Sequence, residues 1–482
     1  MVAMPRRVVR GTLLLAAATV VLLIVSAIFR GPWLDDFATF LFANPAVPWG
    51  VAWHNLWPTD INPPLFYAVA RLWVDLCGTG LWARRMVNIL PLLGLLGWFG
   101  VAWRRFPAQR AFLLLYWLIG ICSAYFFSDF SVYRSYFFQY VAALVFVGAA
   151  TLNYLEQRRE IDWFQLAAVP FLFELHQITA LYAGVMLLAL IGRDLRARNW
   201  PRGLTTGGVA LVSGVPLLVV TWLQLHRQVT ALDNQAWIQR HGVWPSLWLI
   251  LGFLPKALGQ NWLALSGGLV ALFNGYVDRP ARRWLWLLAG VAFVGTGLLL
   301  IANRFTPLIV DRYFAFLTVL CVCGLTLALV ALCARFVWLF YALLAFAAVY
   351  TGVCFVQAVR DQRWSQGADM VANLVAQCPG TRVHAGMMPP NPEEQIGLAF
   401  LAAQRGVTLL PVVPRHIGTG AGACPVLYWT EYYPPSNADV AYWRGDLARA
   451  ANAHAGWGLS GDALARATAA RTRDGVIVIL PP

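Results

Sequence analysis

The sequence predicts an all-α polytopic membrane protein with about 11 transmembrane helices, followed by a small C-terminal α/β domain outside the cytoplasm. Of the 482 residues, 60% are hydrophobic and only 12% are charged. That charged fraction is about half that of an average soluble domain. Apolar stretches long enough to cross a hydrocarbon core recur as far as Val356. Beyond Arg360 the apolar stretches give way to Ala, Gly, Pro, charged residues and short strand-like runs.

The positive charge of the chain indicates membrane orientation and not nucleic-acid binding. The formal net charge is +14, and Lys256 is the only lysine, so arginine supplies almost all of it. The arginines stand in short clusters between apolar segments, as they do on the cytoplasmic side of membrane proteins. We therefore expect a lipid bilayer as a partner and no nucleic acid.

The first apolar segment, Gly11 to Phe29, follows Arg6, Arg7 and Arg10. It is long and lacks a convincing cleavage site, so we interpret it as a retained span that leaves the cytoplasm. Residues 30–81 then form an outer loop. Within that loop, residues 62–78 are predicted to form an interfacial helix, because a crossing there would move the later arginine clusters outside.

The remaining apolar segments alternate across the membrane. Residues 161–192 are too long for one span, and the arginines that follow require a hairpin of two short spans with Glu174 and His176 at its outer tip. A second outer loop is expected at residues 226–261, with an interfacial or re-entrant helix at residues 244–258. The other predicted spans are 82–103, 111–127, 132–155, 205–225, 262–277, 284–301, 312–333 and 336–356.

The chain is thus divided into a membrane domain, residues 1–360, and a C-terminal domain, residues 361–482. Strand-like runs at residues 381–385, 407–413, 426–429 and 475–480 alternate with helical patterns such as residues 364–377, which predicts an α/β domain. With the N-terminus inside, eleven spans place this domain outside the cytoplasm. Cys378 and Cys424 both lie in it, so a disulfide between them is expected. No zinc-ligand spacing is present.

Four groups of polar residues converge on the outer face in this arrangement. Ionisable groups at such positions are commonly functional when they lie inside a helix bundle, and otherwise anchor span ends. The groups are Asp35 and Asp36 after the first span; Asp60 and Asn62 before Pro63-Pro64-Leu65-Phe66-Tyr67; Asp129, Tyr133, Arg134 and Tyr136; and Arg312 and Tyr313, preceded by Arg304.

Their order resembles that in the GT-C membrane glycosyltransferases. The closest groups are the family-39-like bacterial enzymes, which include protein O-mannosyltransferases and lipid A aminoarabinose transferases. The resemblance rests on Asp35-Asp36, the Asn62 to Tyr67 motif, the downstream Arg84, and the later Arg134-Ser135-Tyr136 and Arg312-Tyr313. The usual acidic pair is Asp-Glu, and Val132 stands where an acidic residue is common, so Asp129 is a possible substitute.

The resemblance implies a sugar donor linked to a polyprenyl monophosphate and transfer with inversion of the anomeric centre. A carboxylate can act as the base for an acceptor hydroxyl. We expect Asp35 to do so, with Asp36 orienting it or sharing the role. The departing phosphate is a stable anion that needs positive charge, which Arg312, Arg134 and Arg304 could supply.

The other candidate residues have a structural alternative beside the functional one. Glu174 and His176 either contact the substrate or close the hairpin as a polar pair. Arg71 meets either the donor phosphate or lipid headgroups. Arginines 134 and 312 could also be interfacial anchors. Substrate-binding roles are expected for Asp60, Asn62, Asp129, Tyr133, Tyr136 and Tyr313.

Two other functions remain open at this stage. One is a transporter or flippase of a lipid-linked sugar, although no internal repeat supports it. The other is a glycan ligase or polymerase that uses a diphosphate-linked donor. The acceptor is a lipid, polysaccharide or protein, and no cofactor is expected to be required, although a divalent cation is possible. The alanine-rich, lysine-poor composition points to a GC-rich bacterium, and hence to its inner membrane.

Overall fold

The computed structural model describes residues 5–60, 62–226, 241–305, 307–388, 390–412, 423–431 and 446–482. The chain divides into a helical unit, Met1–Ile28 with Pro45–Ala358, and an α/β unit, Phe29–Asn44 with Val359–Pro482. The predicted domains, 1–360 and 361–482, differ from these units mainly in residues 29–44. That segment, which carries Asp35 and Asp36, groups with the C-terminal residues.

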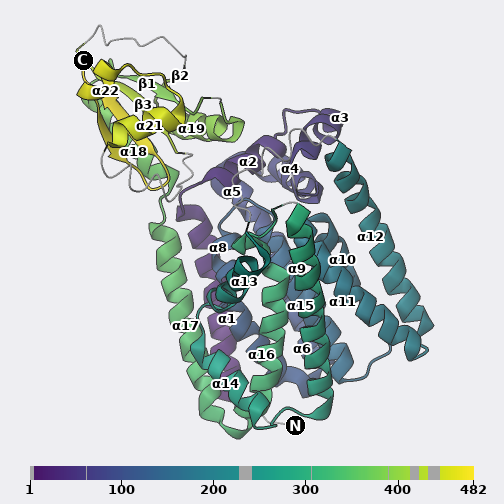
Figure 1. Cartoon of the computed structure of the whole chain (residues 1–482). Coiled ribbons are helices and arrows are strands. Elements are labelled where there is room, and N and C mark those ends of the chain that lie inside the picture. Colours follow the sequence, from purple (N-terminus) through teal and green to yellow (C-terminus); the bar gives the residue numbers. More distant parts are fainter. Residues whose placement is uncertain are drawn as a thin grey trace. The chain divides into compact units, whose positions relative to one another are not determined.

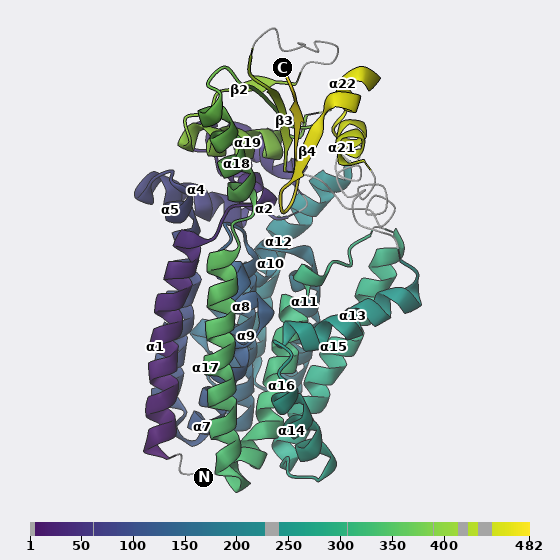
Figure 2. The same cartoon turned by 90° about the vertical axis from the view of Figure 1, so that its left-hand side faces the viewer.

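The helical unit is a bundle of long helices packed side by side (Figures 1 and 2). Its longer helices are α1 (Arg6–Phe29), α4 (Leu65–Cys77), α6 (Ile89–Arg105), α7 (Arg110–Ile121), α9 (Tyr136–Leu155), α10 (Trp163–Glu174), α11 (Gln177–Arg196), α12 (Trp200–His226), α13 (Val243–Ala257), α14 (Trp262–Phe273), α15 (Arg279–Phe305), α16 (Ala315–Arg335) and α17 (Val337–Arg360). Its short helices are α3 (Trp49–Val51), η1 (Ala52–Leu56), η2 (Trp57–Thr59), α5 (Leu81–Arg85), η3 (Met86–Asn88), η4 (Pro107–Gln109), α8 (Ala124–Phe130) and η6 (Asp311–Tyr313).

The apolar helices follow the predicted spans. Among the described residues, eight helices are long and apolar enough to cross a membrane, and the pair α7 and α8 would make a ninth despite a bend of 60°. The predicted single span at residues 111–127 is therefore broken. Ser123 stands at the break, and its side chain caps α8 by accepting from the Tyr125 amide at 3.2 Å.

Two further predicted spans are helices of only 12 residues, α10 and α14. At 1.5 Å per residue each is about 18 Å long, shorter than a hydrocarbon core of about 30 Å. The predicted hairpin is nevertheless present, because α10 ends at Glu174 and α11 begins at Gln177. The predicted helices at residues 62–78 and 244–258 correspond to α4 and α13. Residues 227–240 of the second outer loop lie outside the described residues.

Helix α9 lies at the centre of the bundle and positions the candidate site. All its residues from Tyr136 to Asn153 are buried, and α6, α8, α10, α15 and α16 pack around it. Gly148 lies where a Cβ would come within 2.5 Å of the Trp98 ring, so α6 packs directly on the α9 backbone. The first residues of α9 are thereby held in a fixed place.

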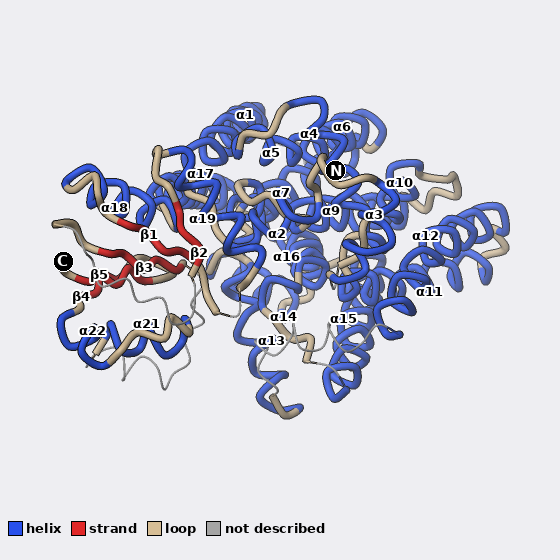
Figure 3. The backbone as a smooth tube through the Cα atoms, turned by 90° about the horizontal axis from the view of Figure 1, so that it is seen from above, coloured by secondary structure: helices blue, strands red, loops and turns tan. Residues whose placement is uncertain are grey.

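The α/β unit contains a five-stranded sheet between two pairs of helices (Figure 3). The strand order is β2-β1-β3-β5-β4; β1 is parallel to β2 and β3, and β5 is antiparallel to β3 and β4. Helices α18 and α19 lie on one face, and α21 and α22 on the other. The elements are α2 (Leu34–Phe42), α18 (Trp364–Gln377), β1 (Arg382–Ala385), α19 (Pro392–Gln404), β2 (Leu409–Pro411), β3 (Val426–Thr430), α21 (Leu447–Ala455), α22 (Gly461–Arg466), β4 (Thr468–Arg471) and β5 (Val476–Leu480).

Candidate functional site

The first polar group of the helical unit centres on Asp60, in the turn between η2 and α4. Tyr67, in the first turn of α4, donates its hydroxyl hydrogen to the Asp60 carboxylate. Asn62 donates from its side-chain amide to Oδ2 of Asp60 at 3.2 Å. Arg134 donates from Nη1 to the Tyr67 hydroxyl at 2.8 Å, and its Nη2 lies 3.7 Å from Asp60. Three predicted residues, Asp60, Asn62 and Arg134, thus meet around Tyr67.

This group is almost fully buried. The Arg134 and Asp60 side chains are 9% and 11% exposed, and Tyr67 is 1% exposed. A buried charge is costly unless it is paired and hydrogen-bonded. The Asp60 carboxylate and the Tyr67 hydroxyl therefore hold the Arg134 guanidinium in a defined orientation.

The second polar group lies at the turn between α10 and α11. His176 is the N-terminal cap of α11, because its Nδ1 accepts a hydrogen bond from the Ile178 amide at 3.2 Å. Its ring lies 4.3 Å from that of Tyr313. Burial lowers the pKa of His176 to about 3, and the positive charges of Arg312 and Arg134 act in the same direction. His176 is therefore neutral, and both arginines lie close enough to influence it.

Arg312 lies beside two aromatic rings at this place. Its Cζ is 5.7 Å from the ring centre of Tyr136 and 5.6 Å from that of Tyr313. The two rings are 6.5 Å apart. Tyr136 begins α9 directly after Arg134 and Ser135, so the two polar groups meet at this end of α9.

The chemistry of this end of the bundle favours an anionic ligand. Two guanidinium groups, which stay charged at any physiological pH, face a neutral imidazole. A planar guanidinium can donate two parallel hydrogen bonds to a phosphate. The tyrosine rings add apolar surface beside the charges. Such a site can stabilise the negative charge of a phosphate group.

Other predicted residues make contacts near the same end of α9. Tyr133 donates its hydroxyl hydrogen to the Ala70 carbonyl at 3.2 Å, and Arg84 lies 5.9 Å from its ring centre. The Asp129 side chain accepts from Ser128 Oγ at 3.0 Å. The Tyr133 contact holds α4 near the start of α9, whereas the Asp129 contact lies within α8.

The remaining predicted residues lie apart from that contact network. Glu174 is buried at the end of α10, but among the described interactions none joins it to His176. Arg71 is buried; it donates to the Pro45 carbonyl at 3.2 Å and lies 4.4 Å from the Trp49 ring centre. Arg304 is exposed in the last turn of α15, as its place at a helix end allows.

Asp35 and Asp36 lie in the first turn of α2, in the α/β unit. Asp36 is fully buried, and its Oδ2 accepts from the Trp33 amide at 3.1 Å. The Asp36 carboxylate therefore stabilises the N-terminus of its own helix, where a negative charge is favourable. Asp35 is 6% exposed.

Cys378 and Cys424 form a disulfide with Cα atoms 5.6 Å apart. It joins the end of α18 to the residues before β3. In the described part of the chain, no group of three or more His, Cys, Asp or Glu side chains could hold a metal ion.

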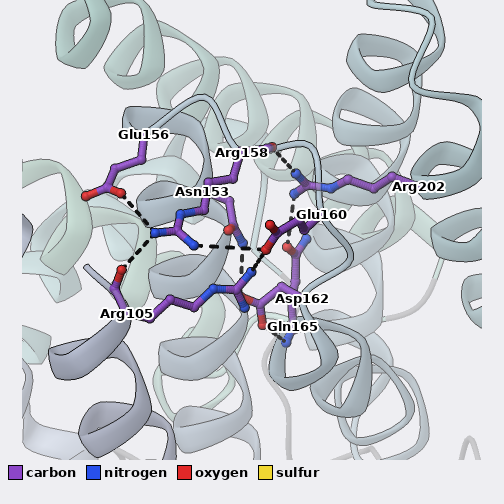
Figure 4. Close-up of polar contacts among 8 residues, drawn as sticks. All are labelled: Arg105, Asn153, Glu156, Arg158, Glu160, Asp162, Gln165 and Arg202. Atoms are coloured by element: carbon purple, nitrogen blue, oxygen red, sulfur yellow. Dashed lines mark hydrogen bonds and ion pairs between the residues drawn. The ribbon is translucent and has the colours of Figure 1, made fainter.

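A further polar cluster lies at the other end of α9 (Figure 4). Helix α9 has 20 residues, so this cluster is roughly 30 Å from the Arg134 end. Its members are Arg105, Asn153, Glu156, Arg158, Glu160, Asp162, Gln165 and Arg202. From the sequence we interpreted arginines here only as markers of the cytoplasmic side; the interleaved acids Glu156, Glu160 and Asp162 are the signal that was missed.

The contacts of this cluster give it a structural role. Asp162 accepts from Asn153 Nδ2 at 3.1 Å and from the Gln165 amide at 3.1 Å, and lies 3.8 Å from Arg105. Arg202 donates to the Arg158 carbonyl at 2.8 Å. The cluster therefore ties together the ends of α6 and α9 and the starts of α10 and α12.

Comparison with known proteins establishes the fold. No protein-family model and no curated protein sequence matches the chain. The fold is similar to that of ArnT from Cupriavidus metallidurans solved with undecaprenyl phosphate bound, with 15% identity over 97% of each chain and a TM-score of 0.52. The apo structure of the same protein gives 16% identity over 97% of each chain and a TM-score of 0.50. These matches confirm the predicted GT-C fold along almost the whole chain.

Proposed function

We propose that this protein is a membrane glycosyltransferase that moves a monosaccharide from a polyprenyl-phosphate donor to an acceptor outside the cytoplasm, with inversion of the anomeric centre. The observation that carries the proposal is the gathering of two arginines at the start of α9: Arg134 is held by Tyr67 and Asp60, and Arg312 lies beside the Tyr136 and Tyr313 rings, next to His176. The fold adds support, because ArnT, which shares it, was solved with undecaprenyl phosphate. The acceptor is a lipid, a polysaccharide or a protein.

In this proposal the two arginines bind the phosphate of the donor. As the bond between the anomeric carbon and the phosphate oxygen breaks, negative charge builds up on the departing polyprenyl phosphate. Guanidinium groups that are already oriented stabilise that charge without reorganisation. Asp60 and Tyr67 hold Arg134 in place for this step. The leaving group thus needs no proton donor and, in our proposal, no metal ion.

Asp35 is the base in this proposal. It removes the proton of the acceptor hydroxyl while the oxygen attacks the anomeric carbon, on the face opposite the phosphate. Asp36 is the poorer choice, because its carboxylate accepts from the Trp33 amide. We therefore propose that Asp36 has a structural role and stabilises the first turn of α2. Asn62, Tyr136 and Tyr313 are proposed to contact the sugar.

The site is proposed to face the periplasm of a bacterium, with the N-terminus in the cytoplasm and the α/β unit outside the inner membrane. The clusters of arginine at the other ends of the spans support this orientation.

The experiment that tests the proposal is Asp35→Asn. We expect transfer to fall by about 10²- to 10⁴-fold, the usual contribution of a general base, to a residual rate. Binding of undecaprenyl phosphate and the thermal unfolding midpoint should stay close to those of the wild type. Asp75→Asn is the matched control, because it makes the same change in charge at an exposed position of α4. Normal turnover by Asp35→Asn would remove Asp35 as the base.

A further inference from the structure

The acidic helix α2 is built into the α/β unit, although it follows the first span in the sequence. Residues 29–44 belong to that unit, and α2 packs on α19. We propose that the α/β unit is a positioning device for Asp35, with the contact between α2 and α19 setting where the carboxylate lies. This inference rests on the proposed role of Asp35 as the base.

The first part of the anchor is made by the backbone just before α2. The Gly31 amide donates to the Asp361 carbonyl at 2.9 Å, and the Trp364 amide donates to the Pro32 carbonyl at 3.2 Å. The Arg30 guanidinium lies 3.3 Å from the Asp361 carboxylate, and both side chains are buried. The chain that leads into α2 is thus fixed to the residues that lead into α18.

Arg363 adds to the same anchor. Its Cζ lies 4.8 Å from the Trp33 ring centre, and its Nε lies 2.9 Å from the Asp361 carboxylate. Trp33 is the N-terminal cap residue of α2. The residues that lead into α2 and the cap residue of this helix therefore all contact residues 361–364.

The second part of the anchor is an aromatic contact along α2. Phe37 is fully buried and lies 5.2 Å from the Trp364 ring and 6.0 Å from the Phe400 ring. Phe40, one turn later, lies 5.3 Å from Phe400. Gly397 of α19 lies beneath Phe37: a Cβ there would come within 2.5 Å of the Phe37 ring and 2.6 Å of the Trp364 ring. The Phe37 and Trp364 rings therefore pack directly against the backbone of α19 at Gly397.

This contact decides the position of α2 because the helix cannot hold itself. It has only nine residues, and isolated helices shorter than about 12 residues are marginal in water. Asp35 precedes Phe37 by two residues, so it projects roughly 160° away from Phe37 around the helix axis. The face that carries Phe37 and Phe40 is used for docking, and Asp35 is left on the opposite face. A small displacement of the docked face would move the carboxylate with it.

Gly397→Ala tests this inference. The added methyl group would need about 1 Å more room to reach ordinary contact with Phe37. A 1 Å misplacement of a catalytic group can cost about 100-fold in rate, so we expect kcat for transfer to fall by roughly 10- to 100-fold. Binding of undecaprenyl phosphate should be unchanged, because the two arginines lie in the helical unit. Gly461→Ala, where nothing lies within 4 Å of the new Cβ, is the matched control and should keep wild-type activity.

The same substitution in the Asp35→Asn background separates positioning from a general loss of structure. If Gly397→Ala acts through Asp35, it should cause no further loss of the residual transfer. Equal losses in both backgrounds, or no loss in either, would overturn the inference. If Gly397→Ala does not fold, Phe400→Leu weakens the same contact more mildly and enters the same comparison. A wild-type protein that transfers no sugar would instead refute the proposed function.

Discussion

The Tyr67 hydroxyl is the central atom of the buried group around Arg134, and Tyr67→Phe removes only that atom. The hydroxyl accepts from Arg134 at 2.8 Å and donates to Asp60. The ring, which is 1% exposed and lies 5.8 Å from the Arg134 Cζ, stays in place. The substitution therefore tests whether the orientation of Arg134 matters, without opening a large cavity.

The expected loss follows from the two hydrogen bonds that disappear. A hydrogen bond to a charged group contributes about 1.5 to 3 kcal/mol. Arg134 keeps its ion pair with Asp60 at 3.7 Å, so we expect the loss of about one such bond to reach the transition state. A loss of about 1.5 to 3 kcal/mol corresponds to a fall in kcat/KM of roughly 10- to 150-fold.

The assay is transfer from an undecaprenyl-phosphate-linked sugar by the purified protein in lipid vesicles, together with binding of undecaprenyl phosphate itself. Both should weaken in Tyr67→Phe. Tyr154→Phe is the matched control: its ring lies at the other end of α9, stacked 4.5 Å from Trp284. Unchanged binding and transfer in Tyr67→Phe would refute the role given to Arg134.

Three further predictions concern stability and are read from the unfolding midpoint. His176 stays neutral in the folded protein, with a pKa of about 3, but takes up a proton below about pH 6.5 when unfolded. The wild type should therefore lose stability as the pH falls through this window, by on the order of 2 kcal/mol at pH 5. His176→Asn should lose less between pH 7.5 and pH 5; an identical pH response would contradict the burial of a neutral imidazole. Asp162→Ala should cost about 2 to 4 kcal/mol, because a helix cap, a buried hydrogen bond from Asn153 and a partly exposed ion pair with Arg105 disappear together, and a change below 0.5 kcal/mol would contradict the role given to this cluster. Cys378→Ser opens a loop that spans 46 residues and should cost roughly 4 kcal/mol; a midpoint equal to that of the wild type, under non-reducing conditions, would count against the disulfide.

The membrane fold was predictable because its signals are local. The length of each apolar segment predicts a span, and the arginine clusters between segments predict its direction. The hairpin at residues 161–192, with Glu174 and His176 at its tip, follows from the arginines after it. The pairing of Cys378 with Cys424 was also predictable, from the compartment expected for the C-terminal domain. Strand β4 was missed because Thr468–Arg471 is short and has no apolar pattern.

The assignment of residues 29–44 to the α/β unit could not be read from the sequence. It depends on Gly397 meeting Phe37 and on Arg30 meeting Asp361, contacts between residues more than 300 positions apart. The network around Tyr67 could not be predicted for a related reason: its partner Arg134 lies 67 positions later in the sequence, and only the fold brings the two side chains together. Arg304 was chosen for its place before Arg312, but helix α15 leaves it exposed.

The central claim, transfer from a polyprenyl monophosphate, is tested most directly by the identity of the lipid product. The purified protein, in vesicles that contain undecaprenyl-phosphate-linked sugars and a lipid extract from the same cells, would be followed by mass spectrometry. We predict that undecaprenyl monophosphate accumulates, that the sugar appears covalently on an acceptor, and that both products form far more slowly with Asp35→Asn. Release of undecaprenyl diphosphate from a diphosphate-linked donor, or movement of the lipid-linked sugar across the vesicle membrane without any covalent product, would contradict the claim.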